Sequence, residues 1–153
     1  MAEFLVDTSV LSALAPGRMG VPEGLAQWIL REEARLFLPA IVLAEIEQGI
    51  SQLRRVGSLA KAALLTDWQA NVTSRFAARI LPLDAEVAIE LGRMSDRLKA
   101  DGRHPGLADT VIAATARVRH KVVLTRNLRH FIPTGVGVAD PFETTFWSPP
   151  QLD

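Results

Sequence analysis

Short runs of apolar residues recur along the chain without alternating polar positions, and longer segments with helical spacing separate them. A short unalternated run is typical of a strand that is buried on both faces of a parallel sheet. Pro82 lies in the third run and predicts an edge strand, because proline cannot donate to a central ladder. The predicted strands cover residues 4–6, 36–38, 80–83 and 122–124, with a last short strand around 136–138.

The segments between these runs carry apolar residues three or four positions apart, which is the spacing of an amphipathic helix. Asp84 is expected to cap one of these helices. Because strands alternate with helices, the pattern favours an α/β fold with a mostly parallel sheet and helices on both of its faces. The predicted helices cover about 9–15, 23–33, 40–56, 59–76, 84–100 and 107–119.

The chain has 153 residues, which is long enough for one hydrophobic core and too short for two ordinary domains. It has no cysteine, and no apolar run approaches the 18 or more residues of a membrane helix. The N-terminus lacks the basic and apolar regions of a secretion signal. We therefore expect a soluble, cytoplasmic protein with no membrane partner.

The formal net charge is zero, but the charges are unevenly distributed. Residues 93–129 contain nine basic and three acidic residues, a net charge of +6, and the rest of the chain carries −6. A polyanionic partner would suit this segment, although a solvated helix face explains such charge runs more often. Arginine outnumbers lysine 14 to 3, which favours phosphate recognition or only reflects genomic base composition.

Three carboxylates occupy unusual positions in this pattern. Asp7 directly follows the first buried strand, at the edge where open parallel sheets bind their ligands. Glu45 borders an apolar helical stripe, and Asp109 lies in the first turn of an apolar helix. Each residue also has a structural explanation, such as capping or a favourable place near a helix N-terminus. Together they favour a divalent cation, because Mg²⁺ and Mn²⁺ prefer hard oxygen ligands.

Five segments, taken in chain order, resemble a PIN domain of the VapC type, including its FitB-like branch. The resemblance covers residues 3 to about 142. We therefore expect a nuclease domain over 1–142 and a C-terminal tail over 143–153. The tail contains Phe146 and Trp147, which would suit either a partner surface or packing onto the domain. The five segments are VDTSVL at 6–11, LAEIEQG at 43–49, LPLD at 81–84, ADTVIAATA at 108–116 and LTRN at 124–127.

The resemblance implies a three-layer α/β/α sandwich around a mostly parallel five-stranded sheet, in which the first and fourth strands are neighbours. It also implies a metal-dependent ribonuclease with Mg²⁺ or Mn²⁺ as its cofactor. By their places in the motifs, Asp7, Glu45 and Asp109 would be the metal ligands and catalytic residues. Thr8 or Ser9, together with Thr125, would orient these ligands or a bound water.

One position departs from the family pattern. The family usually has a fourth acid shortly after the fourth strand, and this chain has Asn127 there. Asparagine can hold a water or coordinate through its carbonyl oxygen, but it brings no charge. Either one metal ion suffices or the activity is weak. The arginines that could hold the RNA backbone are Arg117, Arg126 and Arg129.

The expected partners are an RNA substrate, a cognate antitoxin protein of a type II toxin–antitoxin pair, and a second copy of the chain in a homodimer. Operator DNA would be reached only through the antitoxin. A different class of function stays open: a catalytically weak or inactive PIN-like protein that acts with its antitoxin as a DNA-bound autoregulatory complex. A phosphatase of the haloacid-dehalogenase kind is disfavoured, because it would need an aspartate where this chain has Ser9.

Overall fold

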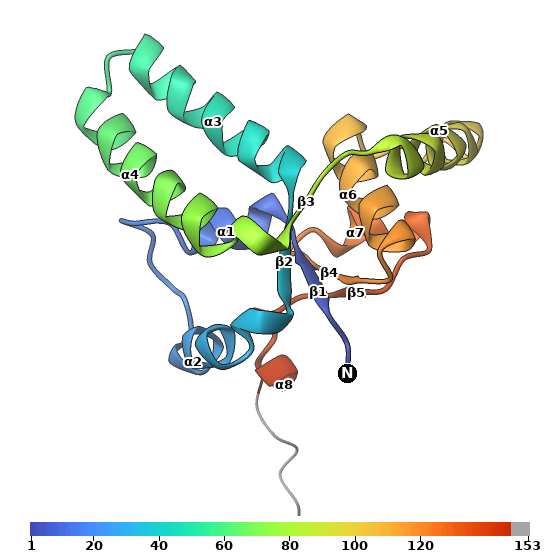
Figure 1. Cartoon of the computed structure of the whole chain (residues 1–153), viewed down its shortest axis with the longest axis horizontal. Helices are drawn as coiled ribbons and strands as arrows, with labels where there is room; N and C mark the ends of the chain where they lie inside the picture. Colours follow the sequence, from blue (N-terminus) through green and yellow to red (C-terminus); the bar gives the residue numbers. More distant parts are fainter. Residues whose placement is uncertain (148–153) are drawn as a thin grey trace, which may run out of the picture.

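Five parallel strands form the sheet at the centre of the computed structural model, which describes residues 1–147 (Figure 1). Their order across the sheet is β3-β2-β1-β4-β5, so β1 lies between β2 and β4. This order confirms the predicted fold class and the predicted edge position of the third strand. That strand is shorter than the predicted 80–83: it ends at Leu81, so Pro82 follows it and does not lie within it. The strands are β1 (Phe4–Val6), β2 (Leu36–Pro39), β3 (Ile80–Leu81), β4 (Val122–Leu124) and β5 (Val138–Ala139).

The six predicted helices are all present, and the structure adds several one-turn elements that the sequence pattern did not predict. One turn is too short for a 3.6-residue periodicity to become visible. The last strand also begins two residues later than expected. The helices are α1 (Thr8–Ala13), α2 (Glu23–Arg31), α3 (Ala40–Arg55), α4 (Leu59–Arg75), α5 (Ala85–Ala100), α6 (Leu107–Val118), α7 (Leu128–Phe131) and α8 (Thr144–Trp147), with 3-10 turns η1 (Glu33–Arg35), η2 (Ala77–Arg79) and η3 (Ile132–Thr134).

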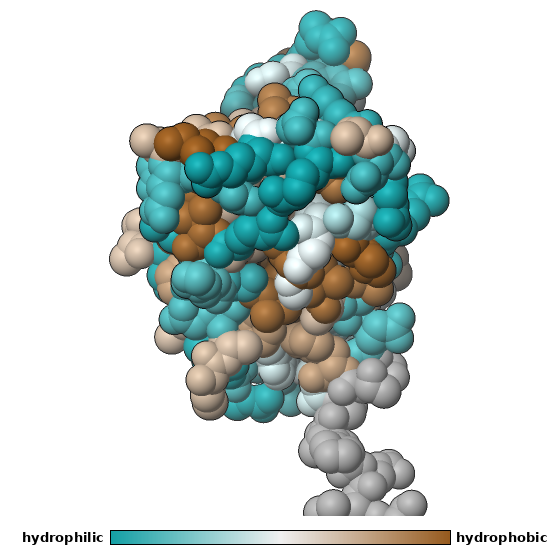
Figure 2. Space-filling model, turned by 90° about the vertical axis from the view of Figure 1, so that its right-hand side faces the viewer, coloured by the Kyte–Doolittle hydropathy of each residue, from teal (hydrophilic) through white to brown (hydrophobic). Residues whose placement is uncertain are grey.

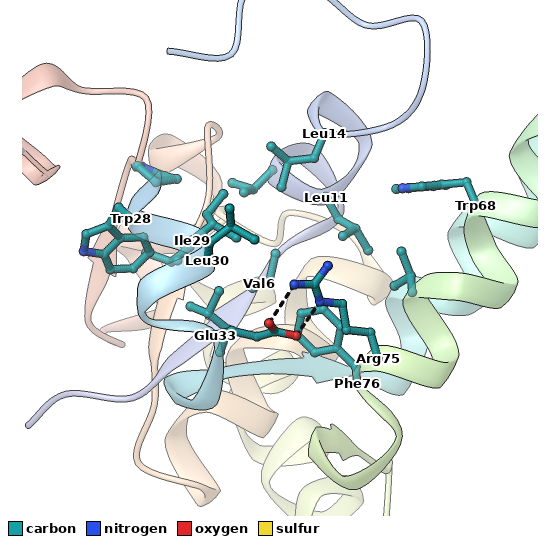
Figure 3. A pocket seen from close by; sticks show the side chains of 15 residues that line it. Val6, Leu11, Leu14, Trp28, Ile29, Leu30, Glu33, Trp68, Arg75 and Phe76 are labelled. Atoms are coloured by element: carbon teal, nitrogen blue, oxygen red, sulfur yellow. Dashed lines mark hydrogen bonds and ion pairs between the residues drawn. The ribbon is translucent and has the colours of Figure 1, made fainter. Parts of the chain in front are cut away.

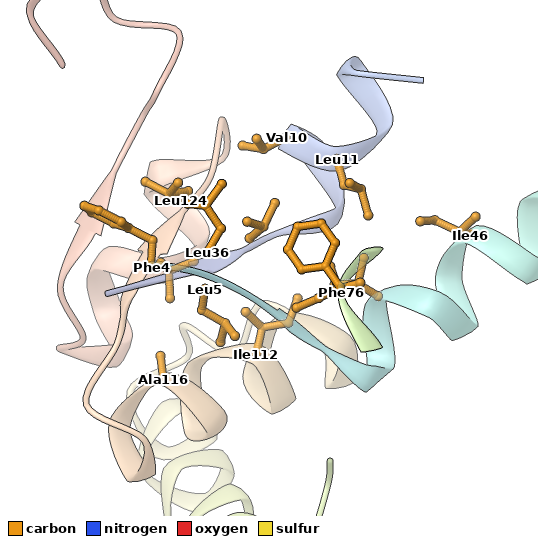
Figure 4. Close-up of a cluster of buried hydrophobic side chains, with 14 of the residues drawn as sticks. Phe4, Leu5, Val10, Leu11, Leu36, Ile46, Phe76, Ile112, Ala116 and Leu124 are labelled. Atoms are coloured by element: carbon orange, nitrogen blue, oxygen red, sulfur yellow. The ribbon is translucent and has the colours of Figure 1, made fainter. Parts of the chain in front are cut away.

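The core lies on both faces of β1, which explains why this strand has no polar position. Leu5 points to one face, toward Ile112 of α6, whereas Val10 and Leu11 of α1 cover the other (Figure 4). Leu5 and Ile112 are completely buried. Helices on both faces of a parallel sheet make the three-layer arrangement that the sequence predicted.

Two helical hairpins flank the sheet. α3 and α4 form one that stands away from it, and α5 packs against α6 on the opposite side (Figure 1). Gly57 has φ +85° in the turn between α3 and α4, a conformation that favours glycine. Within residues 1–147, no helix is both long and apolar enough to span a membrane.

The end of the described chain packs onto α2. The ring of Phe146 lies 4.8 Å from that of Trp28 and 6.0 Å from that of Phe4, measured between centroids. Trp147 lies against Gly24, where an added Cβ atom would be 2.1 Å from its Cζ3 atom. Of the two alternatives for these aromatic residues, the structure therefore has packing onto the domain. The prolines of the tail, Pro149 and Pro150, lie outside the described residues.

The contact between Gly24 and Trp147 leads to a stability test. Gly24→Ala is expected to lower the free energy of unfolding by about 1–2 kcal/mol in urea denaturation, because the new methyl group displaces the indole ring. In a Trp147→Ala background, the same change should become neutral or stabilising. Gly92→Ala is the control: nothing lies within 4 Å of its added Cβ, so it should stabilise by up to about 1 kcal/mol. Equal stabilisation by both alanines in the wild-type background would contradict the packing of Trp147.

Candidate metal centre

Asp7 is the central residue of the site, and only 2% of its surface is exposed. It follows β1 and is the N-cap of α1, so the capping role that the sequence suggested is real. Its Oδ1 atom accepts a hydrogen bond from the backbone N–H of Thr8 at 2.7 Å. Its Oδ2 atom accepts from the hydroxyls of Ser9 at 2.8 Å and Thr125 at 2.7 Å. Both carboxylate oxygens are therefore held in place.

Thr125 connects the end of β4 to this site. It is completely buried, and its hydroxyl both donates to Asp7 and accepts from the backbone N–H of Asn127 at 2.9 Å. The hydroxyl of Ser9 accepts from the backbone N–H of Arg126 at 3.0 Å. Asn127 thus joins the network through its backbone, and its side chain is at the surface.

Glu45 extends from α3 toward the same place. Its Oε1 atom accepts a hydrogen bond of 2.5 Å from the hydroxyl of Thr8. Burial raises the pKa of the Glu45 carboxyl; the hydrogen bond from Thr8 opposes this shift, and the charges of Asp7 and Asp109 add to it. Glu45 therefore lies close enough to Asp7 and Asp109, the other two predicted ligands, for their charges to raise its pKa.

Asp109 lies in the first turn of α6 and is bound by His130 of α7, whose Nδ1 atom is 2.9 Å from Oδ2. Burial raises the pKa of the Asp109 carboxyl, and the charge of Asp7 adds to the rise; the hydrogen bond and charge of His130 oppose it. His130 is not among the site residues predicted from the sequence. The sequence held one signal for a role of His130 in the site: it lies three residues after Asn127, just beyond the fourth strand.

Among the described residues, the three carboxylates have no lysine or arginine as a counterion. Within the part of the chain that the structure describes, no lysine or arginine forms an ion pair with Asp7, Glu45 or Asp109. Oxygen donors of this kind fit Mg²⁺ or Mn²⁺. As the side chains stand, no three His, Asp or Glu residues among 1–147 converge closely enough to hold a metal ion. Sharing one ion therefore requires side-chain rearrangement.

The predicted RNA-binding arginines differ in how they are engaged. Arg117 binds Glu90 at 3.1 Å and the carbonyl oxygen of Thr134, so its guanidinium is occupied within the protein. It also lies eight residues along α6 from Asp109, a distance of about 12 Å. Arg126 is exposed next to Ser9, with its guanidinium 4.2 Å from the centroid of the Phe142 ring. Arg129 is exposed on α7.

Two hollows flank α1 next to the carboxylates. One, of about 280 Å³, lies between α1, α3 and α4 and has Thr8 and Glu45 in its lining. The other, of about 290 Å³, is lined by Ser9 and Arg126 among others. Arg18, from the loop after α1, lines both.

A separate cavity of about 150 Å³ lies between α1, α2 and α4 (Figure 3). Its lining is almost entirely apolar. The two charged residues among those that line it, Glu33 and Arg75, form an ion pair with each other at 2.5 Å. Trp68 of α4 lines both this cavity and the 280 Å³ hollow, so it lies between an almost entirely apolar space and one whose lining also includes charged and polar side chains.

The fold and site together define an α/β protein whose carboxylates gather at the carboxyl edge of a parallel sheet, where β1 and β4 meet. Residues 4–132 match the family model described as the PIN domain. The chain therefore belongs to the PIN domain family.

Curated relatives and solved structures agree with this assignment. The toxin FitB of Neisseria gonorrhoeae is 31% identical over 142 residues, covering 91% of this chain and 98% of the relative. The VapC ribonuclease Y4jK of Sinorhizobium fredii is 26% identical over 141 residues, covering 92% and 98%. The predicted resemblance to VapC-type and FitB-like toxins is thus confirmed.

Two solved complexes show the same fold over nearly the whole chain. The crystal structure of FitAcB from Neisseria gonorrhoeae has a TM-score of 0.75 and 30% identity, and covers 92% of this chain and 99% of that one. The DNA-bound VapBC from Salmonella typhimurium has a TM-score of 0.76 and 27% identity, with the same coverage.

The raised pKa of Glu45 leads to a pH-dependent stability test. Because folding raises this pKa, the ionised carboxylate costs stability at pH values above its folded pKa and costs nothing below its ordinary pKa of about 4.3. Glu45→Gln should therefore raise the free energy of unfolding of the metal-free protein at pH 7. The expected gain is only about 0.5 kcal/mol, because solvent screens a half-exposed site. It should vanish as the pH falls toward 4 in denaturation curves.

Glu47, on the same helix, is the matched control. Hydrogen bonds from Ser51 and then Arg54 lower its pKa, so its ionised form stabilises the fold above its ordinary pKa. Glu47→Gln should accordingly have the opposite sign at pH 7. A loss of stability in Glu45→Gln at pH 7 would contradict the prediction, because it would mean that the ionised Glu45 carboxylate stabilises the fold.

Proposed function

We propose that this chain is a metal-dependent endoribonuclease toxin of a type II toxin–antitoxin pair, which hydrolyses RNA phosphodiester bonds. The observation that carries the proposal is a group of three carboxylates, Asp7, Glu45 and Asp109, at the carboxyl edge between β1 and β4. Within residues 1–147 none of them pairs with a lysine or arginine, and Asp109 is bound only by His130. PIN family membership and the name of the VapC ribonuclease relative support it.

Asp7, Glu45 and Asp109 would hold Mg²⁺ or Mn²⁺. A bound ion of this kind lowers the pKa of a water and neutralises charge on a phosphate. The hydroxyls of Ser9 and Thr125 fix the Asp7 carboxylate, and the hydroxyl of Thr8 fixes Glu45. His130 does the same for Asp109. These contacts leave Glu45 Oε2 and Asp109 Oδ1 without a hydrogen bond inside the described chain, so both are available as ligands.

The proposed protein partner is a cognate antitoxin, through which the chain would reach operator DNA. The support is that the structures it resembles are the complexes FitAB and VapBC, both of which are also described bound to DNA. A homodimer is proposed as well. Exposed apolar residues on the side of α5 to α7 include Ile89, Leu107 and Ile132. Figure 2 shows this side of the molecule, with hydrophobic side chains gathered in its middle.

A second candidate function is a DNA-bound autoregulatory complex in which the chain is catalytically weak or inactive. The observation in its favour is Asn127, which stands where the family usually has a fourth acid and whose side chain is at the surface. Metal-dependent turnover separates the two candidates.

RNA cleavage is the direct test of the proposed function. Purified protein without antitoxin is expected to cut labelled cellular RNA with Mn²⁺ or Mg²⁺ and to stop when a chelator is added. Asp7→Asn should lose at least about a hundredfold in rate, because even residues that only support a metal ligand cost 10–100-fold. Asp67→Asn, an exposed aspartate on α4, should retain the activity. Folded wild-type protein that cuts nothing with metal present would favour the second candidate.

Thr125 tests whether the hydroxyl network positions the site. Thr125→Val keeps the volume but removes the hydrogen bond to Asp7, and should weaken Mn²⁺ binding or cleavage about 10–100-fold. Thr125→Ser should restore most of the loss. Thr115→Val is the control, because Thr115 is also buried but its hydroxyl bonds only to the carbonyl oxygen of Val111. Mn²⁺ affinity by calorimetry, unchanged in Thr125→Val, would exclude a positioning role.

A further inference from the structure

The hollow between α1, α3 and α4 opens directly beside the proposed metal centre. Thr8 and Glu45, which share a hydrogen bond of 2.5 Å, belong to its lining. A molecule that occupies this hollow therefore lies next to the carboxylates. The chemistry of the remaining lining residues indicates what that molecule is.

Two cations line this hollow, and neither is used by the fold. Arg18 comes from the loop after α1 and Lys61 from the first turn of α4, and both side chains are exposed. Neither forms an ion pair within residues 1–147, in contrast to Arg54, Arg75 and Arg119. Cations without an acidic partner are available to bind an anion.

An anion that approaches the carboxylates needs such cations. Asp7, Glu45 and Asp109 repel a phosphate group, and positive charge on the approach path offsets this repulsion. Arg18 also lines the second hollow together with Arg126. Ser12 of α1 also lines both hollows. The cations Lys61, Arg18 and Arg126 therefore follow one path around α1, which suits a chain of phosphates better than a single one.

The rest of the hollow is apolar and includes an aromatic ring. Ile46 and Ile50 of α3 and Leu65 and Trp68 of α4 line it. An indole ring beside cationic side chains is the combination that binds single-stranded nucleic acid, because exposed bases stack on aromatic rings while cations contact the backbone. Paired bases in a duplex are not free to stack in this way.

The 150 Å³ cavity on the other side of Trp68 does not offer these features. Its two charged lining residues, Glu33 and Arg75, neutralise each other, and the rest of its lining is apolar. A polyanion therefore has no free cation to bind there among the described lining residues. Of the two spaces that share Trp68, only the larger hollow fits RNA.

We propose that the hollow between α1, α3 and α4 binds single-stranded RNA, with Arg18 and Lys61 contacting phosphates next to the cleaved bond and Trp68 offering a stacking surface. The proposal rests on the ribonuclease function proposed above. Arg18, Lys61 and Trp68 are not among the RNA-binding residues predicted from the sequence, whereas the predicted residue Arg126 lies on the same path.

Binding of a labelled single-stranded RNA of about 12 nucleotides, measured in chelator so that nothing is cut, tests this assignment. The double variant Arg18→Ala/Lys61→Ala should raise the Kd roughly ten- to thirtyfold near 0.1 M salt. The slope of log affinity against log salt should fall by about 1.4, which corresponds to two lost phosphate contacts. RNA should also change the tryptophan fluorescence of the wild-type protein, and this change should be lost in Trp68→Phe.

The control variant is Arg55→Ala/Arg93→Ala, which removes the same charge from exposed residues outside both hollows. Its Kd should change less than threefold. Equal losses in both double variants would overturn the assignment, because the effect would then come from net charge. An unchanged Kd in Arg18→Ala/Lys61→Ala, while the wild-type protein cuts RNA, would overturn this inference alone and leave the hollow to a protein partner. Folded wild-type protein that neither binds nor cuts RNA would overturn the proposed function as well.

Discussion

The buried carboxylate of Asp7 depends on three hydrogen-bond donors that come from two different strand ends. A buried carboxylate is costly unless its oxygens are paired. The backbone of Thr8 and the hydroxyls of Ser9 and Thr125 supply that pairing. Because Thr125 can donate only when β4 lies beside β1, the site and the sheet order depend on each other.

The acidic group is held together at an electrostatic cost. Burial and mutual repulsion raise the pKa values of Glu45 and Asp109. Natural sites retain such groups where their chemistry is used, so the strain supports a functional explanation over a purely structural one. The helix-capping role of Asp7 and its proposed role as a ligand are compatible, because the capping bond from Thr8 uses only one of the two lone pairs of Oδ1. The other lone pair of Oδ1 stays available to a metal ion, whereas Oδ2 accepts from the hydroxyls of Ser9 and Thr125.

The charged residues of the chain divide into those that the fold uses and those that it leaves free. Arg79 and Arg117 bind backbone carbonyl oxygens and carboxylates within the protein. Arg18 and Lys61 do not form ion pairs within residues 1–147, and both line the hollow beside the acids. The apolar cavity on the other side of Trp68 has its one ion pair internally neutralised. A hollow whose cations are unpaired in the described chain and an almost entirely apolar cavity therefore lie close together around α1 but differ in chemistry.

The sequence by itself determined the buried strands, the six helices from α1 to α6, the edge position of β3 and the family, because these follow from residue periodicity and from motifs within single segments. It also identified Asp7, Glu45 and Asp109 as candidates. The tertiary structure decided which side chains meet, including the pairing of Asp109 with His130 and the packing of Phe146. It also decided that Arg117 is bound within the protein, whereas Arg18 lines the hollow without an ion pair in residues 1–147. The physical reason is separation along the chain: Thr8 and Glu45 are 37 positions apart, and Asp7 and Thr125 are 118 apart. Contacts over such distances depend on how the layers pack, which no local pattern records.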